Sequence, residues 1–109
     1  MKLIQCIIQP NKIEDVVEAL QTVATGMMMW EVSGYGHQKG HSLMYRGVEY
    51  EATLLPKMMI EIVTEDNRID DIVKVVMVAA RTGHIGDGRI FVLPILEAYH
   101  VRTGFMDLD

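Results

Sequence analysis

Cysteine is almost absent from this 109-residue sequence, in which Cys6 stands alone. No internal disulfide and no cysteine-rich zinc site can form from a single cysteine. Long apolar runs are also missing, and no stretch approaches the roughly 20 residues that span a bilayer. The first ten residues lack the small-residue cleavage site of a signal peptide. We therefore expect a cytoplasmic protein without membrane insertion.

Basic residues are scarce as well: 10 Lys and Arg stand against 15 Asp and Glu, which gives a net charge of −5. This balance argues against nucleic acid as a partner, because nucleic acid attracts basic patches. Half of the residues are hydrophobic, which is typical of globular chains. The length predicts a single domain over residues 1–109, and self-association would bury more apolar area than so small a chain buries alone.

The apolar pattern predicts alternating strands and helices. A helix is expected after Asn11, which forms a capping-box pattern with Glu14, and a second one after Asn67. Gly26 would close the first helix. Strands are expected over residues 2–9, 27–33, 58–64 and 90–93, with a short extended piece over 98–102. The order predicts an α+β protein with a ferredoxin-like split βαβ-βαβ arrangement and a long exposed loop between its second and third strands.

That loop, residues 34–56, has no clear periodicity and carries several glycines. Loops longer than about 15 residues in small domains are usually functional or disordered. Its glycine-rich start, Gly34-Tyr35-Gly36-His37-Gln38-Lys39-Gly40, is not the dinucleotide fingerprint, because the spacing differs and no helix follows. We therefore expect function here without assigning a ligand from this pattern.

A second glycine-rich turn, Gly86-Asp87-Gly88-Arg89, directly precedes a predicted strand. Its glycines allow backbone N–H groups to face an anion, and Arg89 adds a fixed charge. A tight turn with a solvent-facing arginine is the alternative. His100 and Arg102 alternate and would share one strand face. Together with Lys39, these cations favour a polyphosphate pocket.

Catalytic and metal sites find little support in the pattern. The four histidines, His37, His41, His84 and His100, show no compact metal-binding spacing. No serine, cysteine or paired-carboxylate catalytic arrangement can be assembled, so we do not expect an enzyme. An acylphosphatase-like site would need an arginine that Gln9-Pro10-Asn11-Lys12 lacks. An RNA-binding module would need aromatic motifs on its sheet.

The sequence resembles the PII family of nitrogen-regulatory signal proteins from Met1 to about Gly104. The blocks that carry the resemblance are Gly36-His37-Gln38-Lys39-Gly40-His41, Tyr45-Arg46-Gly47-Val48-Glu49-Tyr50, Leu55-Pro56-Lys57, Thr82-Gly83-His84-Ile85-Gly86-Asp87-Gly88-Arg89-Ile90-Phe91-Val92 and Arg102-Thr103-Gly104.

The resemblance implies a homotrimer that binds ATP or ADP in three clefts between neighbouring subunits. One subunit would supply Ile7, Gly36, His37, Gln38, Gly86, Asp87, Gly88 and Arg89. The next subunit would supply Met28, Glu61, Ile62, Val63, His100 and Arg102. Residues 82–89 would be the phosphate-binding B-loop, and residues 100–109 the C-terminal segment.

The resemblance also implies that 2-oxoglutarate binds beside MgATP. Gln38 would reach the Mg²⁺, while Lys39, Gly40 and Lys57 would complete the 2-oxoglutarate site. Residues 34–56 would be the T-loop, which contacts a target membrane transporter or metabolic enzyme. Tyr50 matches a tyrosine that some members have uridylylated.

Three positions depart from the family pattern: Met28 replaces a threonine near the purine, Val48 a small residue, and His100 an arginine. An imidazole in place of a guanidinium makes a permanent charge depend on pH. A PII-like regulator of a metal or inorganic-carbon transporter is therefore the alternative function, which His37 and His41 also favour.

Overall fold

The computed structural model describes residues 1–37, 43–45, 48–50 and 52–107. A four-stranded sheet with the order β2-β5-β1-β6 forms its centre. The elements in chain order are β1 (Lys2–Ile8), a 3-10 turn (Pro10–Lys12), α1 (Ile13–Leu20), β2 (Met28–His37), β3 (Leu43–Tyr45), β4 (Val48–Tyr50), β5 (Ala52–Thr64), a second 3-10 turn (Asp66–Arg68), α2 (Ile69–Ala80) and β6 (Gly88–Pro94). The pairing is antiparallel throughout, which confirms the predicted ferredoxin-like arrangement.

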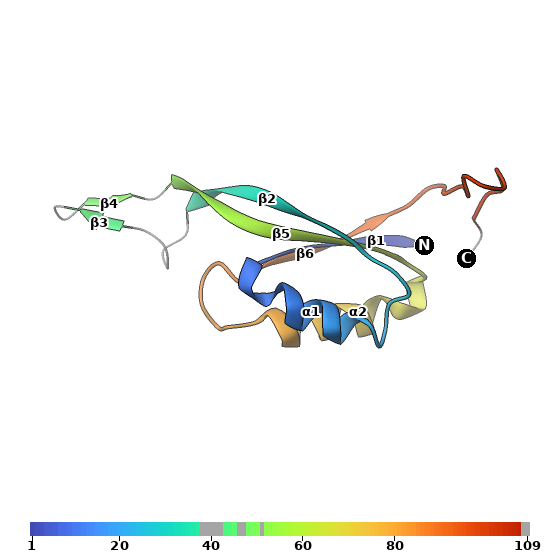
Figure 1. Cartoon of the computed structure of the whole chain (residues 1–109), viewed down its shortest axis with the longest axis horizontal. Coiled ribbons are helices and arrows are strands. Elements are labelled where there is room, and N and C mark those ends of the chain that lie inside the picture. The colour runs from blue at the N-terminus through green and yellow to red at the C-terminus, as the bar shows by residue number, and fades with distance from the viewer. Residues whose placement is uncertain (38–42, 46–47, 51, 108–109) are drawn as a thin grey trace.

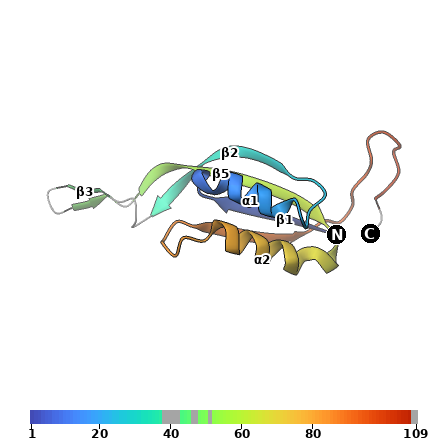
Figure 2. The ribbon, with the colours of Figure 1, turned by 60° about the horizontal axis from the view of Figure 1, so that its bottom comes forward.

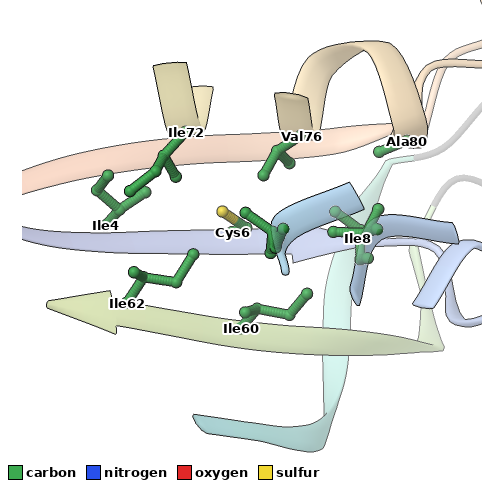
Figure 3. Packing of buried hydrophobic residues seen from close by; sticks show 10 residues of the cluster. Ile4, Cys6, Ile8, Ile60, Ile62, Ile72, Val76 and Ala80 are labelled. Atoms are coloured by element: carbon green, nitrogen blue, oxygen red, sulfur yellow. The ribbon is translucent and has the colours of Figure 1, made fainter. Parts of the chain in front are cut away.

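Both helices pack on the same face of the sheet (Figures 1 and 2). Strand β1 alternates, so every second side chain, from Ile4 to Ile8, points to the helices and is buried. Figure 3 shows Ile4, Cys6 and Ile8 of β1 in a row between Ile60 and Ile62 of β5 on one side and Ile72, Val76 and Ala80 of α2 on the other. The core consists of Ile4, Cys6, Ile8, Val16, Leu20, Ile60, Ile62, Ile72, Val76 and Ala80. Burial raises the pKa of the Cys6 thiol to about 11, so this thiol is unreactive at neutral pH.

The opposite face of the sheet, called the open face below, carries the alternate side chains of all four strands. It has no described element over it in Figures 1 and 2. The strand registers place Leu3, Gln5, Ile7, Met28, Trp30, Met59, Glu61, Val63, Arg89, Phe91 and Leu93 on it. Several of these are large apolar side chains that remain exposed, among them Met28, Trp30 and Phe91. A face this apolar indicates a contact surface.

Strands β2 and β5 continue well beyond the body of the molecule (Figure 1). They pair from Met28 with Glu61 to His37 with Ala52, and β3 and β4 form a small hairpin further out. The longest dimension of the molecule is 61 Å for this reason. The described residues of the range 34–56 therefore form an arm that is largely strand, whereas the sequence predicted no regular structure there. The glycines conceal the strand periodicity, because they add no side chain to the pattern.

Three local predictions were wrong. Neither Asn11 nor Asn67 caps a helix: both lie inside 3-10 turns, and the helices begin at Ile13 and Ile69 without a side-chain cap. The first helix ends at Leu20, well before Gly26. Residues 98–102 do not form a strand, as the backbone turns at 101–103 and makes an isolated bridge from Tyr99 to Met106. His100 and Arg102 therefore do not share a strand face.

Among the described residues, no helix is both long enough and apolar enough to cross a membrane.

Candidate functional site

The loop that joins α2 to β6, residues 82–88, is built around the Asp87 carboxylate. This group accepts backbone hydrogen bonds from Thr82 N at 2.8 Å and Gly83 N at 2.9 Å, and one from the Thr82 hydroxyl. These bonds, the Thr82 hydroxyl first, hold the pKa of Asp87 below its usual value. The carboxylate thus closes the loop on itself.

Glycine is required at the end of this loop. Gly86 and Gly88 have φ angles of 103° and 116°, a region that other residues rarely adopt. A Cβ on Gly88 would lie 1.7 Å from the carbonyl oxygen of Ile7, because Gly88 pairs directly with Ile8 at the start of β6. The loop backbone therefore lies directly against strand β1, and Arg89 follows on the open face.

Two side chains hold the loop from inside the molecule. Gln9 Nε2 and Lys57 Nζ both donate to the carbonyl oxygen of Gly86, at 2.6 Å and 3.0 Å. Lys57 is buried, and this desolvation lowers its pKa, although the nearby charge of Asp87 acts in the opposite direction. The sequence analysis missed Gln9, since a glutamine next to Pro10 carries no motif.

The residues expected to meet the purine lie on strands β2 and β5 of the same sheet. Met28 belongs to edge strand β2 and pairs with Glu61 on β5. Glu61 accepts a hydrogen bond from Gln5 Nε2 at 2.8 Å on the open face. Val63 is exposed on the same face, whereas the Ile62 side chain is buried in the core, so only its backbone is available to a ligand.

Met28 and the loop at residues 82–88 lie at opposite edges of one sheet, because β2 and β6 are its edge strands, whereas Glu61 and Val63 lie on the interior strand β5. Three interstrand spacings of about 4.8 Å separate the edges. A second copy that places its β2 edge beside the β6 edge of the first would bring the loop at residues 82–88 and Met28 together. One chain alone leaves them apart.

The C-terminal segment folds back beside the end of β5. His100 Nε2 lies 3.4 Å from Asp107 Oδ1. The backbone N–H of His100 donates to the backbone carbonyl oxygen of Phe105 at 2.9 Å. Asp107, Val63 and Arg68 line one cavity of about 290 Å³. Arg102 is exposed at the turn, where its guanidinium is available to an anion.

Several predicted residues lie in the outer arm. Gln38, Lys39, Gly40 and His41 lie outside the described residues. The backbones of Gly36 and His37 belong to β2, and that of Tyr50 belongs to β4. No cluster of three metal-binding side chains occurs in the part of the chain that the structure describes.

Comparison with known proteins shows which family this chain is similar to. The family described as "Nitrogen regulatory protein P-II" matches residues 1–105. The chain is 45% identical over 108 residues to "Nitrogen regulatory protein GlnK" of Escherichia coli strain K12, which covers 98% of this chain and 96% of that protein. "Nitrogen regulatory protein P-II 1" of the same strain is 49% identical over 108 residues, with the same coverage. "Nitrogen regulatory protein P-II" of Pasteurella multocida is 48% identical over 105 residues, 95% of this chain and 94% of that protein.

Proposed function

Since the chain belongs to the P-II family of nitrogen regulatory proteins, we propose that it is a non-catalytic sensor of ATP and ADP. It responds to 2-oxoglutarate when MgATP is bound, and it controls a target protein through the arm formed by residues 34–56. The observation that carries the proposal is the loop at residues 82–88, whose one carboxylate is turned inward and whose glycine backbone is closely fitted to β1.

The loop suits the phosphates of a nucleotide. The N–H groups of Thr82 and Gly83 bond the Asp87 carboxylate, so the backbone N–H groups beside Gly86, which has a positive φ, would be the donors to an anion. Arg89 adds a charged fork of donors at the start of β6. The Asp87 carboxylate would repel an anion, but its hydrogen bonds to Thr82 and Gly83 hold it inside the loop.

The open face supports the homotrimer. Its apolar side chains, such as Trp30 and Phe91, lose contact with water when two further copies pack against it. Closed symmetry then repeats one heterologous contact three times. Each contact brings the β6 edge of one copy to Met28, Glu61 and Val63 of the next. The adenine would lie against Met28, Glu61 and Val63, with His100 and Arg102 of the same copy at the phosphates.

The 2-oxoglutarate site is assigned to the base of the arm. The Lys57 ammonium, held beside Gly86, can bind a carboxylate of the ligand. Gln38, Lys39 and Gly40 would complete the site, and the Gln38 amide oxygen would hold the Mg²⁺ that accompanies ATP. Ligands act on the arm only through a difference in affinity between its conformations.

The target is a membrane transporter or a metabolic enzyme reached in the cytoplasm, and Tyr50 on the arm is the position available for modification. The β2 and β5 strands carry the arm well clear of the body (Figure 1), where its tip can enter a partner's surface. The departures at Met28 and His100 leave a metal or inorganic-carbon transporter as the alternative target.

Titration calorimetry tests the proposed function. We expect ATP and ADP to compete for the same clefts, and 2-oxoglutarate to bind only in the presence of ATP and Mg²⁺. His100→Arg should raise the affinity for ATP relative to AMP, because it restores a permanent charge. Absence of nucleotide binding at millimolar concentrations would contradict the proposal. Tight AMP binding without any 2-oxoglutarate response would favour the alternative.

The lowered pKa of Lys57 gives the same titration a pH dependence. Only the ammonium form attracts a carboxylate, so the affinity for 2-oxoglutarate should fall as pH rises through this pKa, below the ordinary lysine value of 10.5. The free energy of unfolding shows the opposite trend. Because the pKa of Lys57 is lower in the folded chain than in the unfolded chain, the destabilisation caused by burying its charge decreases as pH rises from the folded pKa to the unfolded pKa. Lys57→Arg, which stays charged, is the control. Equal pH profiles for the two proteins would contradict the assignment.

A further inference from the structure

The carbonyl oxygen of Gly86 accepts two side-chain hydrogen bonds, one from the residue after β1 and one from β5. Gln9, directly after β1, donates from Nε2 at 2.6 Å, and Lys57, within β5, donates from Nζ at 3.0 Å. A carbonyl oxygen has two lone pairs, so both are used. A loop carbonyl that accepts hydrogen bonds from two side chains, one of them buried, is held in one orientation.

This orientation decides where the next N–H group points. The chain has no cis peptide bonds, and in a planar trans peptide the carbonyl and the following N–H point in opposite directions. Since the Gly86 carbonyl faces Gln9 and Lys57, the N–H of Asp87 faces away from them, out of the loop. Gly86 itself has a φ of 103° and no side chain to restrict rotation. The two donors therefore fix this peptide.

The two anchors are not equivalent. Lys57 is charged and is the residue assigned above to a carboxylate of 2-oxoglutarate. Gln9 is neutral, and no ligand is assigned to it.

We propose that Gln9 is a positioning residue for the phosphate loop: it fixes the Gly86–Asp87 peptide so that the Asp87 N–H is presented to the nucleotide phosphates. The proposal rests on the proposed function, because it assigns phosphates to this loop. It places the amide of Gln9 behind the loop, where it acts on affinity without touching the nucleotide.

Gln9→Met tests the proposal, because it keeps the length of the side chain and removes the donor. We expect ATP and ADP affinity to fall roughly 3- to 10-fold, the effect of one lost hydrogen bond, with adenosine affinity changed less than about twofold. Gln9→Glu, which matches glutamine in shape but offers no donor at neutral pH, should lose at least as much. Gln21→Met at the exposed end of α1 is the matched control and should bind like the unchanged protein.

Backbone order parameters provide a readout that needs no ligand. In Gln9→Met the amides of Gly86 and Asp87 should move from the rigid range to values below about 0.6, with the sheet, including Gly88, unchanged. The proposal is overturned if the variant keeps both its ATP affinity and its rigid loop, or if adenosine and ATP weaken equally. Should the unchanged protein bind no nucleotide, the proposed function fails, and the order parameters still decide whether Gln9 fixes the peptide.

Discussion

We expect Phe91→Asp to separate the proposed trimer into single folded chains and to abolish nucleotide binding. Phe91 lies on the open face opposite Gln5, and 43% of its surface is exposed in the single chain. In the proposed trimer this surface is covered, so a carboxylate there would have to be buried without a partner, which costs several kcal/mol per subunit. Analytical ultracentrifugation should show the mass of one chain in place of three.

The matched control is Val78→Asp on α2. Val78 is more exposed, at 82%, but it lies on the helix layer, away from the open face. The same kind of change should therefore leave the assembly and nucleotide binding intact. Far-ultraviolet circular dichroism separates dissociation from unfolding. A Phe91→Asp protein that stays trimeric would show that the subunits meet through another surface.

Gly88→Ala is the second change with a large expected effect. The added methyl group would lie 1.7 Å from Ile7 O, and the φ of 116° is strained for alanine in addition. Neither β1 nor β6 can move without breaking the sheet register. We expect a loss of roughly 3 kcal/mol or more in the free energy of unfolding, together with loss of ATP binding.

Gly83→Ala separates the clash from the backbone strain. Gly83 has a similar φ of 88°, but nothing lies within 4 Å of its added Cβ. This variant should lose only about 1 kcal/mol and should retain nucleotide binding. Urea denaturation measures both variants. Equal stabilities for Gly83→Ala and Gly88→Ala would contradict the close fit of the loop against β1.

The sequence was sufficient to predict the order of strands and helices, because the apolar periodicity of segments such as 58–64 and 69–80 reflects burial directly. It also located the loop around Gly86-Asp87-Gly88-Arg89, because the positive φ angles of Gly86 and Gly88 require glycine there. Helix starts were predicted less well, since Asn11 and Asn67 lie inside 3-10 turns and do not cap the helices that follow.

Long-range contacts could not be predicted from the pattern. The approach of Gln9 and Lys57 to one carbonyl joins residues 77 and 29 positions from Gly86, and no local spacing encodes it. Residues 98–102 were expected to form a short extended piece, with His100 and Arg102 on one face. In the structure, backbone bonds from His100 to Phe105 and Gly104 turn the chain there.

The composite nature of the site is tested most directly with mixed trimers. Arg89→Ala removes a cation of the subunit that carries the loop, and Arg102→Ala removes a cation that the neighbouring subunit would place at the phosphates. Each change should weaken ATP binding by roughly 10- to 100-fold, as expected for a charged hydrogen bond. The two variants are refolded together in equal amounts, and tight ATP sites are counted. Because each cleft takes one half from each of two subunits, about a quarter of the clefts should regain full affinity. If the mixture binds no better than the separate variants, the site does not lie between subunits.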